Sequence, residues 1–430
     1  SELWVGTGGV GAWGGCVTER EERSRAAGAF GYRARGCQGC RGPPVVSGGL
    51  NRRIADQLEA LRQRDRFRQR RIVEPAGAGC ARVAGRDCIN FCSNDYLGLA
   101  QDPRLRAGPG ASGSAASALI TGYSPSHAEL EARLADWLQR DRVLLFPTGF
   151  SANVGIIDAL LQRGDLAVCD ALNHASLIDG VRLSGADKRI YAHAGVDQAR
   201  RALAEPVAGI KALITDAVFS MDGDSAPLQA LSHEAQRADA LFYVDDAHGL
   251  GVEGGDGRGV AGELSQDALP VLVGTLGKAL GAAGAFVAGP ASLIAYLENR
   301  ARSQIYSTAF APMTANAALV ALDIARQEVW RRDHVHRLVA RLHARLDAAD
   351  LPVPDSQTAI QPIVLEASRW GMRVSHALLA GGFLGTAIRP TTGQEGDARL
   401  RVTLTAAHSQ EQVDGLVDAL ADSLVEARVA

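Results

Sequence analysis

The chain has 430 residues, of which 47% are hydrophobic and 22% are charged, the ordinary balance of a soluble globular protein. This length is enough for one large and one smaller domain. The formal net charge of -3 argues against a chain-wide basic surface for nucleic acid. No apolar run approaches the roughly 18 residues of a membrane span, and the first residues do not resemble a secretory signal. We therefore expect a cytoplasmic protein with no membrane contact.

Residues 1–49 are rich in Gly and Arg and have no helical or strand period, so we expect a disordered extension. They contain Gly6-Thr7-Gly8-Gly9-Val10-Gly11, a formal GxGxxG. That dinucleotide-binding pattern needs a strand before it and a helix after it, and the flanking residues favour neither. Cys37 and Cys40 form a CxxC without a second ligand pair at zinc spacing, so we interpret the seven cysteines as reduced thiols.

Beyond the extension, the first predicted elements are a polar helix at about 52–70, a strand that breaks into a turn at 90–99, and a loop at 108–118. Ser126 and Glu129 then predict a capping box at the start of an amphipathic helix. From about residue 140, continuous apolar runs alternate with helical segments, which is typical of a parallel sheet buried on both faces. The predicted strands are 143–146, 212–219, 240–245, 271–275 and 285–288, followed by 362–366, 386–388 and 400–404.

These elements predict an α/β fold with a large, mostly parallel sheet domain and a smaller C-terminal α+β domain. The expected division is an extension at 1–49, an N-terminal helix and small-domain segment at 50–93, a large domain at 94–325 and a small domain at 326–430.

Lys278 follows the apolar run 271–275 directly. An amine at the end of a buried strand is partly desolvated, which lowers its pKa and makes it a nucleophile toward a carbonyl carbon. A phosphate-binding P-loop is excluded, because that pattern needs Gly where Leu272 stands and Ser or Thr where Ala279 stands. Lys278 is therefore either a Schiff-base lysine or a lysine at a helix start that reaches solvent.

Asp245 and His248 follow the apolar run 240–244, at the strand end where α/β sheets bind ligands. A carboxylate there could keep a pyridine nitrogen protonated, and His248 could bind a phenolic oxygen. A metal site is the alternative, since Asp and His are common ligands, although no ligand beyond Asp245, Asp246 and His248 is obvious nearby.

Further candidates are weak when each is taken alone. The turn before Gly149 and Phe150 opens a helix after a strand, which suits a phosphate group. His174 could stack on a planar ring, Ser220 follows a strand, and Arg389 could bind a carboxylate. Together with Lys278, Asp245 and His248, these residues form the set of partners that pyridoxal phosphate requires.

With these residues in place, the sequence resembles the α-oxoamine synthases, a branch of the aspartate-aminotransferase-like (fold type I) pyridoxal-phosphate enzymes. The resemblance runs from about residue 50 to the C-terminus. The motifs that carry it are SNDYLGL (93–99), TGYSPSH (121–127), NHASL (173–177), VFSMDGDSAPL (218–228), VDDAHG (244–249), TLGKALG (275–281) and RLRVTLTAAH (399–408). VDDAHG and GDSAPL are the forms typical of the 8-amino-7-oxononanoate synthase branch.

The resemblance implies a homodimeric acyltransferase of biotin biosynthesis. Its reaction condenses L-alanine with a pimeloyl thioester of CoA or acyl carrier protein and releases CO2 and the carrier thiol. By motif, Lys278 is the Schiff-base lysine that also moves the Cα proton, Asp245 pairs with the pyridinium, His248 with the phenolic oxygen, and His174 stacks on the ring. The other implied contacts are Gly149, Phe150 and Thr275 at the phosphate, Ser307 and Thr308 at the partner subunit's phosphate, Ser220 beside the cofactor, Asn94 near the reacting centre, Arg389 and the neighbouring Thr392 at the substrate carboxylate, and Arg68 at the far carboxylate of the acyl chain.

The chain departs from the family in two places. Residues 104–118 are shorter than usual and lack an arginine before Leu119-Ile120, and Pro390-Thr391-Thr392-Gly393-Gln394 replaces Pro-Pro-Thr-Val-Pro. Three alternatives to the implied reaction stay open: a sister enzyme that uses glycine or serine with another acyl-CoA, a catalytically silent cofactor-binding member, and a nicotinamide dehydrogenase built on the N-terminal GxGxxG.

Overall fold

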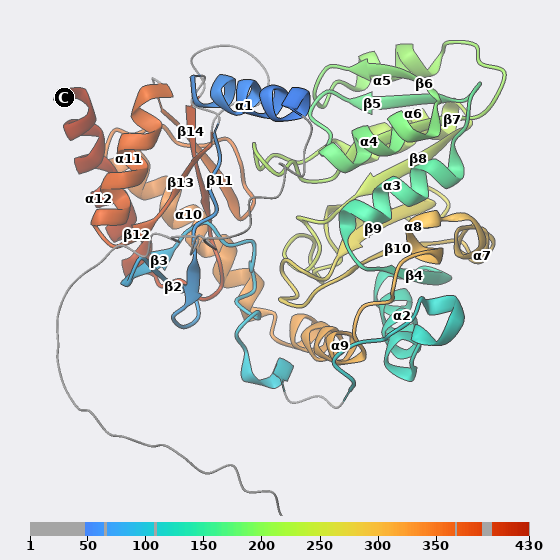
Figure 1. Ribbon diagram of the computed structural model, residues 1–430, viewed down its shortest axis with the longest axis horizontal. Coiled ribbons are helices and arrows are strands. Elements are labelled where there is room, and N and C mark those ends of the chain that lie inside the picture. The colour runs from blue at the N-terminus through green and yellow to red at the C-terminus, as the bar shows by residue number, and fades with distance from the viewer. Residues whose placement is uncertain (1–47, 64–66, 107–109, 366–367, 389–397, 430) are drawn as a thin grey trace, which may run out of the picture. The chain divides into compact units, whose positions relative to one another are not determined.

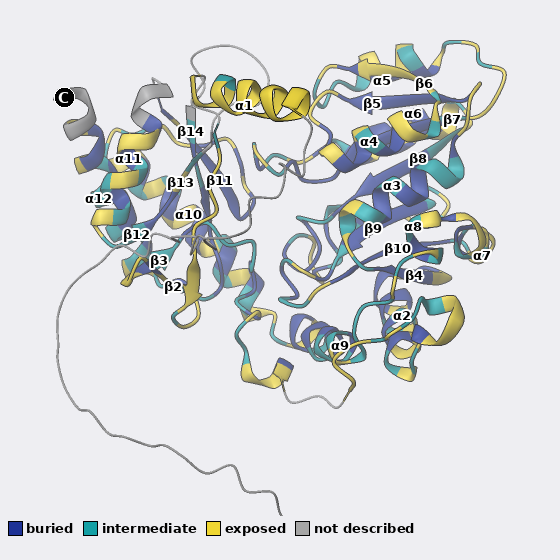
Figure 2. Cartoon of the chain, in the orientation of Figure 1, coloured by how far each residue is buried: buried dark blue, intermediate teal, exposed yellow. Residues whose placement is uncertain are grey.

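The computed structural model describes residues 48–63, 67–106, 110–365, 368–388 and 398–429 (Figure 1). The chain divides into two compact units, residues 1–68 and 69–430. The first unit contains α1 (Gly48–Gln63), on which no residue is buried (Figure 2). The GxGxxG and CxxC patterns lie outside the described residues, as does nearly all of the extension predicted at 1–49.

The larger unit is built on a sheet whose described strands follow the order β4-β10-β9-β8-β7-β5-β6. Strands β9, β8, β7, β5 and β6 run parallel, while β10 is antiparallel to both β4 and β9. The prediction of a mostly parallel sheet is thus confirmed. The strands are β4 (Arg142–Phe146), β5 (Leu166–Asp170), β6 (Asp187–Tyr191), β7 (Lys211–Asp216), β8 (Ala240–Asp245), β9 (Val271–Thr275) and β10 (Ala285–Gly289).

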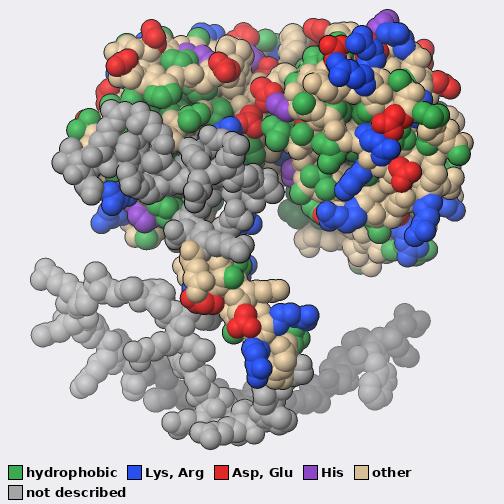
Figure 3. Space-filling view, turned by 90° about the horizontal axis from the view of Figure 1, so that it is seen from above, with side chains coloured by type: hydrophobic (Ala, Val, Ile, Leu, Met, Phe, Trp, Pro, Cys, Tyr) green, Lys and Arg blue, Asp and Glu red, His purple; other side chains and the backbone are tan. Residues whose placement is uncertain are grey.

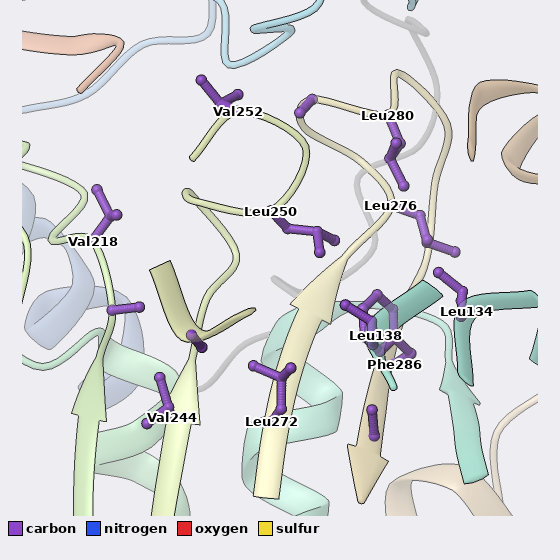
Figure 4. Packing of buried hydrophobic residues seen from close by; sticks show 14 of the residues in the cluster. Leu134, Leu138, Val218, Val244, Leu250, Val252, Leu272, Leu276, Leu280 and Phe286 are labelled. Carbon is purple, nitrogen blue, oxygen red and sulfur yellow. The ribbon is translucent and has the colours of Figure 1, made fainter. Parts of the chain in front are cut away.

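Helices cover both faces of this sheet, because alternate strand residues enter two separate apolar cores. On β9, Leu272 joins one core, and Val271 and Val273 join the other. Figure 4 shows the first core, where Phe286 of β10 lies beside Leu138. Helices on that face are α2 (Pro125–Leu138), α5 (Val196–Leu203), α6 (Leu228–Arg237) and α9 (Pro312–Gln327). Those on the other face are α3 (Gly149–Leu160), α4 (Ala175–Ser184) and α7 (Ala291–Arg300), with the short α8 (Arg302–Ile305) after them.

The start of α2 differs from the prediction. The N-cap is Ser124, not Ser126, and the reciprocal residue of the capping box is His127 rather than Glu129. The reason is Pro125, whose fixed φ and missing N–H suit the first position of a helix. The helix therefore begins before Ser126.

The C-terminal part has its own apolar core, formed by α10 (Trp330–Ala348), α11 (Ser368–Ala380), α12 (Gln410–Val429) and an antiparallel sheet in the order β11-β14-β13. These strands are β11 (Ile360–Leu365), β13 (Thr386–Ile388) and β14 (Ala398–Thr403). A further sheet joins β12 (Phe383–Leu384) in parallel to β3 (Arg86–Asn90), so an early segment pairs with a late one. The same sheet continues with β2 (Cys80–Val83) and β1 (Val73–Pro75).

The surface agrees with the near-neutral composition. On the face seen in Figure 3, basic and acidic side chains are mixed rather than gathered by sign. Within the described residues, no helix has the length and apolarity needed to cross a bilayer.

Gly274 makes room for an aromatic side chain at the centre of the sheet. It lies opposite Phe286 in the β9–β10 register, and a Cβ at position 274 would stand 2.5 Å from that ring. Phe286 is fully buried, so its ring has no free space to move into.

We therefore predict that Gly274→Ala lowers the free energy of unfolding by about 1–3 kcal/mol through overpacking. Gly255→Ala is the matched control, because a Cβ at position 255 would meet nothing within 4 Å. Urea unfolding followed by circular dichroism measures both variants. Equal stability of the two would contradict this account of the β9–β10 packing.

Candidate active site

Lys278 lies in the turn that follows β9, and the turn is fixed by its own backbone. The N–H of Gly281 donates to the carbonyl of Lys278 at 2.9 Å. Gly281 has φ +60°, and a Cβ there would come within 2.4 Å of the backbone of Ala100, so only glycine fits. Burial lowers the pKa of the Lys278 amine to about 8, although the carboxylates of Asp245 and Asp216 act against this shift. Near neutral pH the amine is therefore partly uncharged and nucleophilic.

Asp245 and Asp216 are register partners at the carboxyl ends of β8 and β7. Burial and the neighbouring Asp245 raise the pKa of Asp216 well above its ordinary value, so Asp216 holds its proton. Asp216 also accepts a hydrogen bond from the backbone N–H of His174 at 2.7 Å. Asp245 instead accepts from two N–H donors, the side chain of Asn153 at 2.6 Å and the backbone of Ala247 at 2.9 Å. Asp245 is therefore the carboxyl group of the pair with more N–H donors to stabilise a negative charge.

Asn153 fixes the orientation of Asp245 and is itself fully enclosed. Its Oδ1 accepts from the hydroxyl of Tyr243 at 2.7 Å, which leaves Nδ2 to donate to Asp245 and to Ser176 Oγ. Ser176 Oγ lies 2.7 Å from Nδ1 of His174, whose ring stays exposed at the start of α4. The chain of hydrogen bonds thus links the carboxylate of Asp245 to the exposed imidazole of His174.

His248 is held neutral in the same site. Burial lowers its pKa well below the ordinary value, and the positive charge of Lys278 acts in the same direction. Its Nδ1 lies 2.7 Å from the hydroxyl of Tyr96, which is 3.2 Å from Oδ1 of Asn94. Tyr96 therefore occupies Nδ1 and leaves Nε2 as the nitrogen for a ligand.

The N-terminus of α3 forms a cradle for an anion. Thr148 is the N-cap, and its side chain accepts from the N–H of Ser151 at 3.1 Å. The first N–H groups of a helix, here those of Gly149 and Phe150, have no intrahelical acceptor. A Cβ at Gly149 would meet nothing within 4 Å, and the side chain of Phe150 is exposed, so the approach to these amides is open.

Arg401, on β14, reaches this site, whereas the sequence pattern favours Arg389. The Nε of Arg401 donates to the carbonyl of Ser220 at 2.7 Å, and its Nη2 donates to Oδ1 of Asn94 at 3.2 Å. The guanidinium also acts to lower the pKa of Lys278. Arg389 and Thr392 lie outside the described residues. A signal for Arg401 is present in RLRVTLTAAH, where Arg401 is the one arginine inside the predicted strand 400–404.

The positions of four other predicted residues say less about how a ligand would bind. The hydroxyl of Thr275 donates to the carbonyl of Gly284 at 3.0 Å. Thr308 is exposed and its backbone bridges to Ser117, and Ser307 precedes it in the same segment. Arg68 is exposed and belongs to the unit of residues 1–68.

A metal site is the alternative interpretation of Asp245 and His248. In the part of the chain that the structure describes, no group of three His, Cys, Asp or Glu side chains is arranged to hold an ion. The described site instead combines a nucleophilic amine, a fixed carboxylate, two imidazoles, a helix N-terminus and a guanidinium. This set can bind a planar, anionic heterocycle with a carbonyl carbon and an amino acid beside it.

Comparison with known proteins agrees with this geometry. Residues 86–420 match the family model for aminotransferase class I and II. The chain is 48% identical over 391 residues to the 8-amino-7-oxononanoate synthase of Alkalilimnicola ehrlichii, covering 88% of this chain and 99% of that protein. It is 48% identical over 378 residues to the enzyme of the same name from Methylococcus capsulatus, covering 86% of this chain and 98% of that protein.

Solved structures extend the similarity. The serine palmitoyltransferase of Sphingomonas wittichii superposes with a TM-score of 0.81 at 26% identity, over 89% of this chain and 98% of the other. The 8-amino-7-oxononanoate synthase of Francisella tularensis superposes with a TM-score of 0.68 at 26% identity, over 80% of this chain and 99% of the other. The chain belongs to the aminotransferase class I and II family and, within it, to the α-oxoamine synthases that include the 8-amino-7-oxononanoate synthases.

Proposed function

We propose that this chain is a pyridoxal-phosphate-dependent acyltransferase that condenses L-alanine with a pimeloyl thioester to give 8-amino-7-oxononanoate, a step of biotin biosynthesis. The observation that carries the proposal is the 48% identity to an 8-amino-7-oxononanoate synthase along 99% of that protein's length. The arrangement around Lys278 supports it independently, because the residues needed for the chemistry lie together at one edge of the sheet.

The residues of the site fit pyridoxal phosphate. The half-desolvated amine of Lys278 suits covalent attachment to the aldehyde carbon, and the amides of Gly149 and Phe150 suit the phosphate. Asp245 is aligned by Asn153, and its two N–H donors stabilise the negative charge that a partner for the ring nitrogen must carry. His248 retains one imidazole nitrogen for the phenolic oxygen, and the exposed ring of His174 is available for stacking.

The bound cofactor supplies a sink for the electron pair that remains on the α-carbon when a proton leaves it. Asp245 keeps the ring nitrogen protonated, because an ionised, hydrogen-bonded carboxylate stabilises the positive charge there. The amine of Lys278, when not bound to the cofactor, would be the base that removes the Cα proton of L-alanine. Arg401 holds the alanine carboxylate through its planar guanidinium, which Ser220 and Asn94 orient.

The homodimer and the cytoplasmic location belong to the same proposal. Ser307 and Thr308 would reach the phosphate bound to the partner subunit. The segments around them carry exposed apolar side chains, Leu119, Ile120 and Tyr306, of which Ile120 is 76% exposed and Tyr306 73% exposed. Apolar surface of this kind is typical of contact with another chain. Arg68 at the far acyl carboxylate remains a prediction from the resemblance.

A sister reaction is the second candidate, because a serine palmitoyltransferase superposes with a TM-score of 0.81. The deciding experiment supplies L-alanine, glycine or L-serine with pimeloyl-CoA, pimeloyl acyl carrier protein or palmitoyl-CoA and identifies the product by mass spectrometry.

With the wild-type enzyme we expect 8-amino-7-oxononanoate from L-alanine and a pimeloyl thioester. Lys278→Ala should abolish both turnover and fixation of the cofactor by borohydride, whereas Lys188→Ala, at an exposed position of β6, should keep both. Faster turnover of glycine or serine would favour the sister reaction. Absence of turnover with every pair of substrates would leave a silent family member.

The pKa of Lys278 predicts how cofactor capture depends on pH. The amine must be neutral to react, and its pKa of about 8 makes the neutral fraction rise about tenfold between pH 7 and pH 9. The rate at which the cofactor-free protein takes up pyridoxal phosphate, followed by absorbance, should rise by the same factor. A rate that is flat across this range would contradict the pKa assigned to Lys278.

Arg401 should act mainly on amino-acid binding. We predict that Arg401→Lys raises KM for L-alanine about tenfold or more and changes kcat less, because lysine cannot form the planar two-point contact. Arg399→Lys is the matched control on the same strand, since Arg399 pairs with Asp222 instead. Steady-state kinetics measures both. An equal effect of the two variants would remove Arg401 from the carboxylate site.

A further inference from the structure

A short hairpin follows β7 and reaches the proposed carboxylate site. Residues 217–226 fold back on themselves through an antiparallel bridge between Val218 and Ser225. At the tip of this hairpin, the carbonyl of Ser220 accepts the 2.7 Å hydrogen bond from Nε of Arg401. The position of the 217–226 hairpin therefore determines where one of the two contacts that orient Arg401 is found.

His193 contacts both arms of this hairpin. It stands between β6 and α5, and its Nε2 lies 2.7 Å from Oδ2 of Asp224. The centroid of its ring lies 4.3 Å from that of the buried Phe219, with the two rings nearly perpendicular. Phe219 directly precedes Ser220, and its N–H donates to the carbonyl of Asp224 at 3.0 Å. One imidazole thus contacts the two residues that flank the tip of the hairpin.

Asp170 joins His193 to the large sheet. This buried carboxylate ends β5 and accepts from the backbone N–H groups of Leu172 and Ala194, each at 2.8 Å, so its position is fixed without His193. Nδ1 of His193 lies 3.0 Å from Oδ1 of Asp170. A ring with a carboxylate at each nitrogen donates twice only as the imidazolium. Burial acts to lower the pKa of His193, but the hydrogen bonds to Asp170 and Asp224 outweigh it and raise the pKa above its ordinary value.

Asp224 depends on His193 for the hydrogen bond to its side chain. Within the described residues, its other oxygen, Oδ1, is buried without a hydrogen-bond partner. Without the imidazole the carboxylate would have to reach water, and the hairpin would have to move with it. On the opposite side, the carbonyl of Gly223 accepts from the hydroxyls of Ser356 and Thr358, each at 2.8 Å. The hairpin is therefore held between the C-terminal part and the large sheet, with His193 on the side of the sheet.

We propose that His193 is a positioning residue for amino-acid binding. It fixes the 217–226 hairpin to the large sheet, and the hairpin in turn sets the Ser220 carbonyl that orients Arg401. The hydrogen bonds of His193 go to two carboxylates, so it acts on the substrate only through Arg401. This role rests on the proposed function, in which Arg401 holds the carboxylate of the amino acid.

Two substitutions separate the two hydrogen bonds of His193. In His193→Gln the amide nitrogen stands near the place of Nε2 and keeps a donor for Asp224. In His193→Asn it stands near the place of Nδ1 and keeps a donor for Asp170. The dissociation constant of L-alanine from the holoenzyme is measured by the absorbance of the bound cofactor, without an acyl donor. We expect His193→Asn to raise this constant about fivefold or more and His193→Gln to stay within about twofold of the wild type.

The same two variants distinguish positioning from a general loss of stability. Each loses one hydrogen bond, so a purely structural role would change amino-acid binding alike in both. The kcat at saturating L-alanine should change less than about twofold in either variant, because Lys278 is untouched. His233→Ala, at an exposed position of α6, is the control and should leave binding and kcat unchanged. Equal dissociation constants for His193→Asn and His193→Gln would overturn the proposal.

A second measurement tests whether His193 acts through Arg401. Adding His193→Asn to Arg401→Lys should raise the dissociation constant by less than about a further twofold, because the Ser220 carbonyl no longer orients a planar guanidinium. Asp224→Ala removes the same contact from the side of the hairpin and should behave like His193→Asn in both backgrounds. Independent, multiplicative effects of His193→Asn and Arg401→Lys would contradict the proposed role.

The same titrations with glycine and L-serine separate the role of His193 from the proposed reaction. All three amino acids carry the same carboxylate, so the variants should shift the dissociation constant of whichever one the wild type binds. Tighter binding of glycine or L-serine, with the same pattern across the variants, would support the role of His193 and revise the proposed reaction. Unchanged binding of every amino acid in His193→Asn and Asp224→Ala would overturn the role of His193 and leave the proposed reaction standing.

Discussion

The alignment of three adjacent strand ends places a desolvated amine next to two carboxyl groups, and the rest of the site depends on it. Strands β9, β8 and β7 are parallel neighbours, so the residues that follow or end them meet at one edge of the sheet. Lys278, Asp245 and Asp216 come from these three strands in turn. A shift of one residue in either pairing would move each side chain to the opposite face of the sheet, and an acidic side chain would then point into the apolar core. The two apolar cores determine the strand register, and the register in turn determines which side chains meet at this edge of the sheet.

The two acids at this edge have different surroundings: burial and the neighbouring Asp245 raise the pKa of Asp216 well above its ordinary value, whereas Asp245 accepts from two N–H donors. Were both ionised, their charges would hold the proton on Lys278 and the amine would lose its nucleophilicity. Were both neutral, a ring nitrogen would lose the negative partner that keeps it protonated. Asn153 favours the ionised form of Asp245, since its amide donates to that carboxylate while Tyr243 occupies its oxygen. A buried amide on α3 thus supports the negative charge at this edge of the sheet.

Much of this arrangement could be predicted from sequence, for a physical reason. Parallel strands present their carboxyl ends at one edge, so the apolar runs that end in Asp245 or lead to Lys278 point to a common site. The predicted bounds of β8 and β9 agree with the structure for the same reason, since both strands are buried and apolar along most of their length. Strands β5 and β6 were not predicted. Strand β6 is an edge strand of mostly exposed, polar residues, whereas β5 is short and buried.

The supporting residues were beyond sequence reasoning because their partners are distant in the chain. Tyr96 reaches His248 across 152 positions, and Tyr243 reaches Asn153 across 90. Local patterns do not encode such pairs. The predicted capping box of α2 was wrong for a different reason. Pro125 suits the first position of a helix, so the helix begins before Ser126, whatever the spacing of Ser126 and Glu129.

Arg401, the proposed carboxylate contact, also joins distant segments of the larger unit. It stands on β14 in the C-terminal part, yet its two hydrogen bonds go to Ser220, after β7, and to Asn94, after β3. An arginine on a strand between two such acceptors loses little further freedom when a carboxylate arrives, so the cost of ordering is met during folding. The proposed carboxylate contact and the packing of the C-terminal part against the large sheet therefore depend on the same side chain.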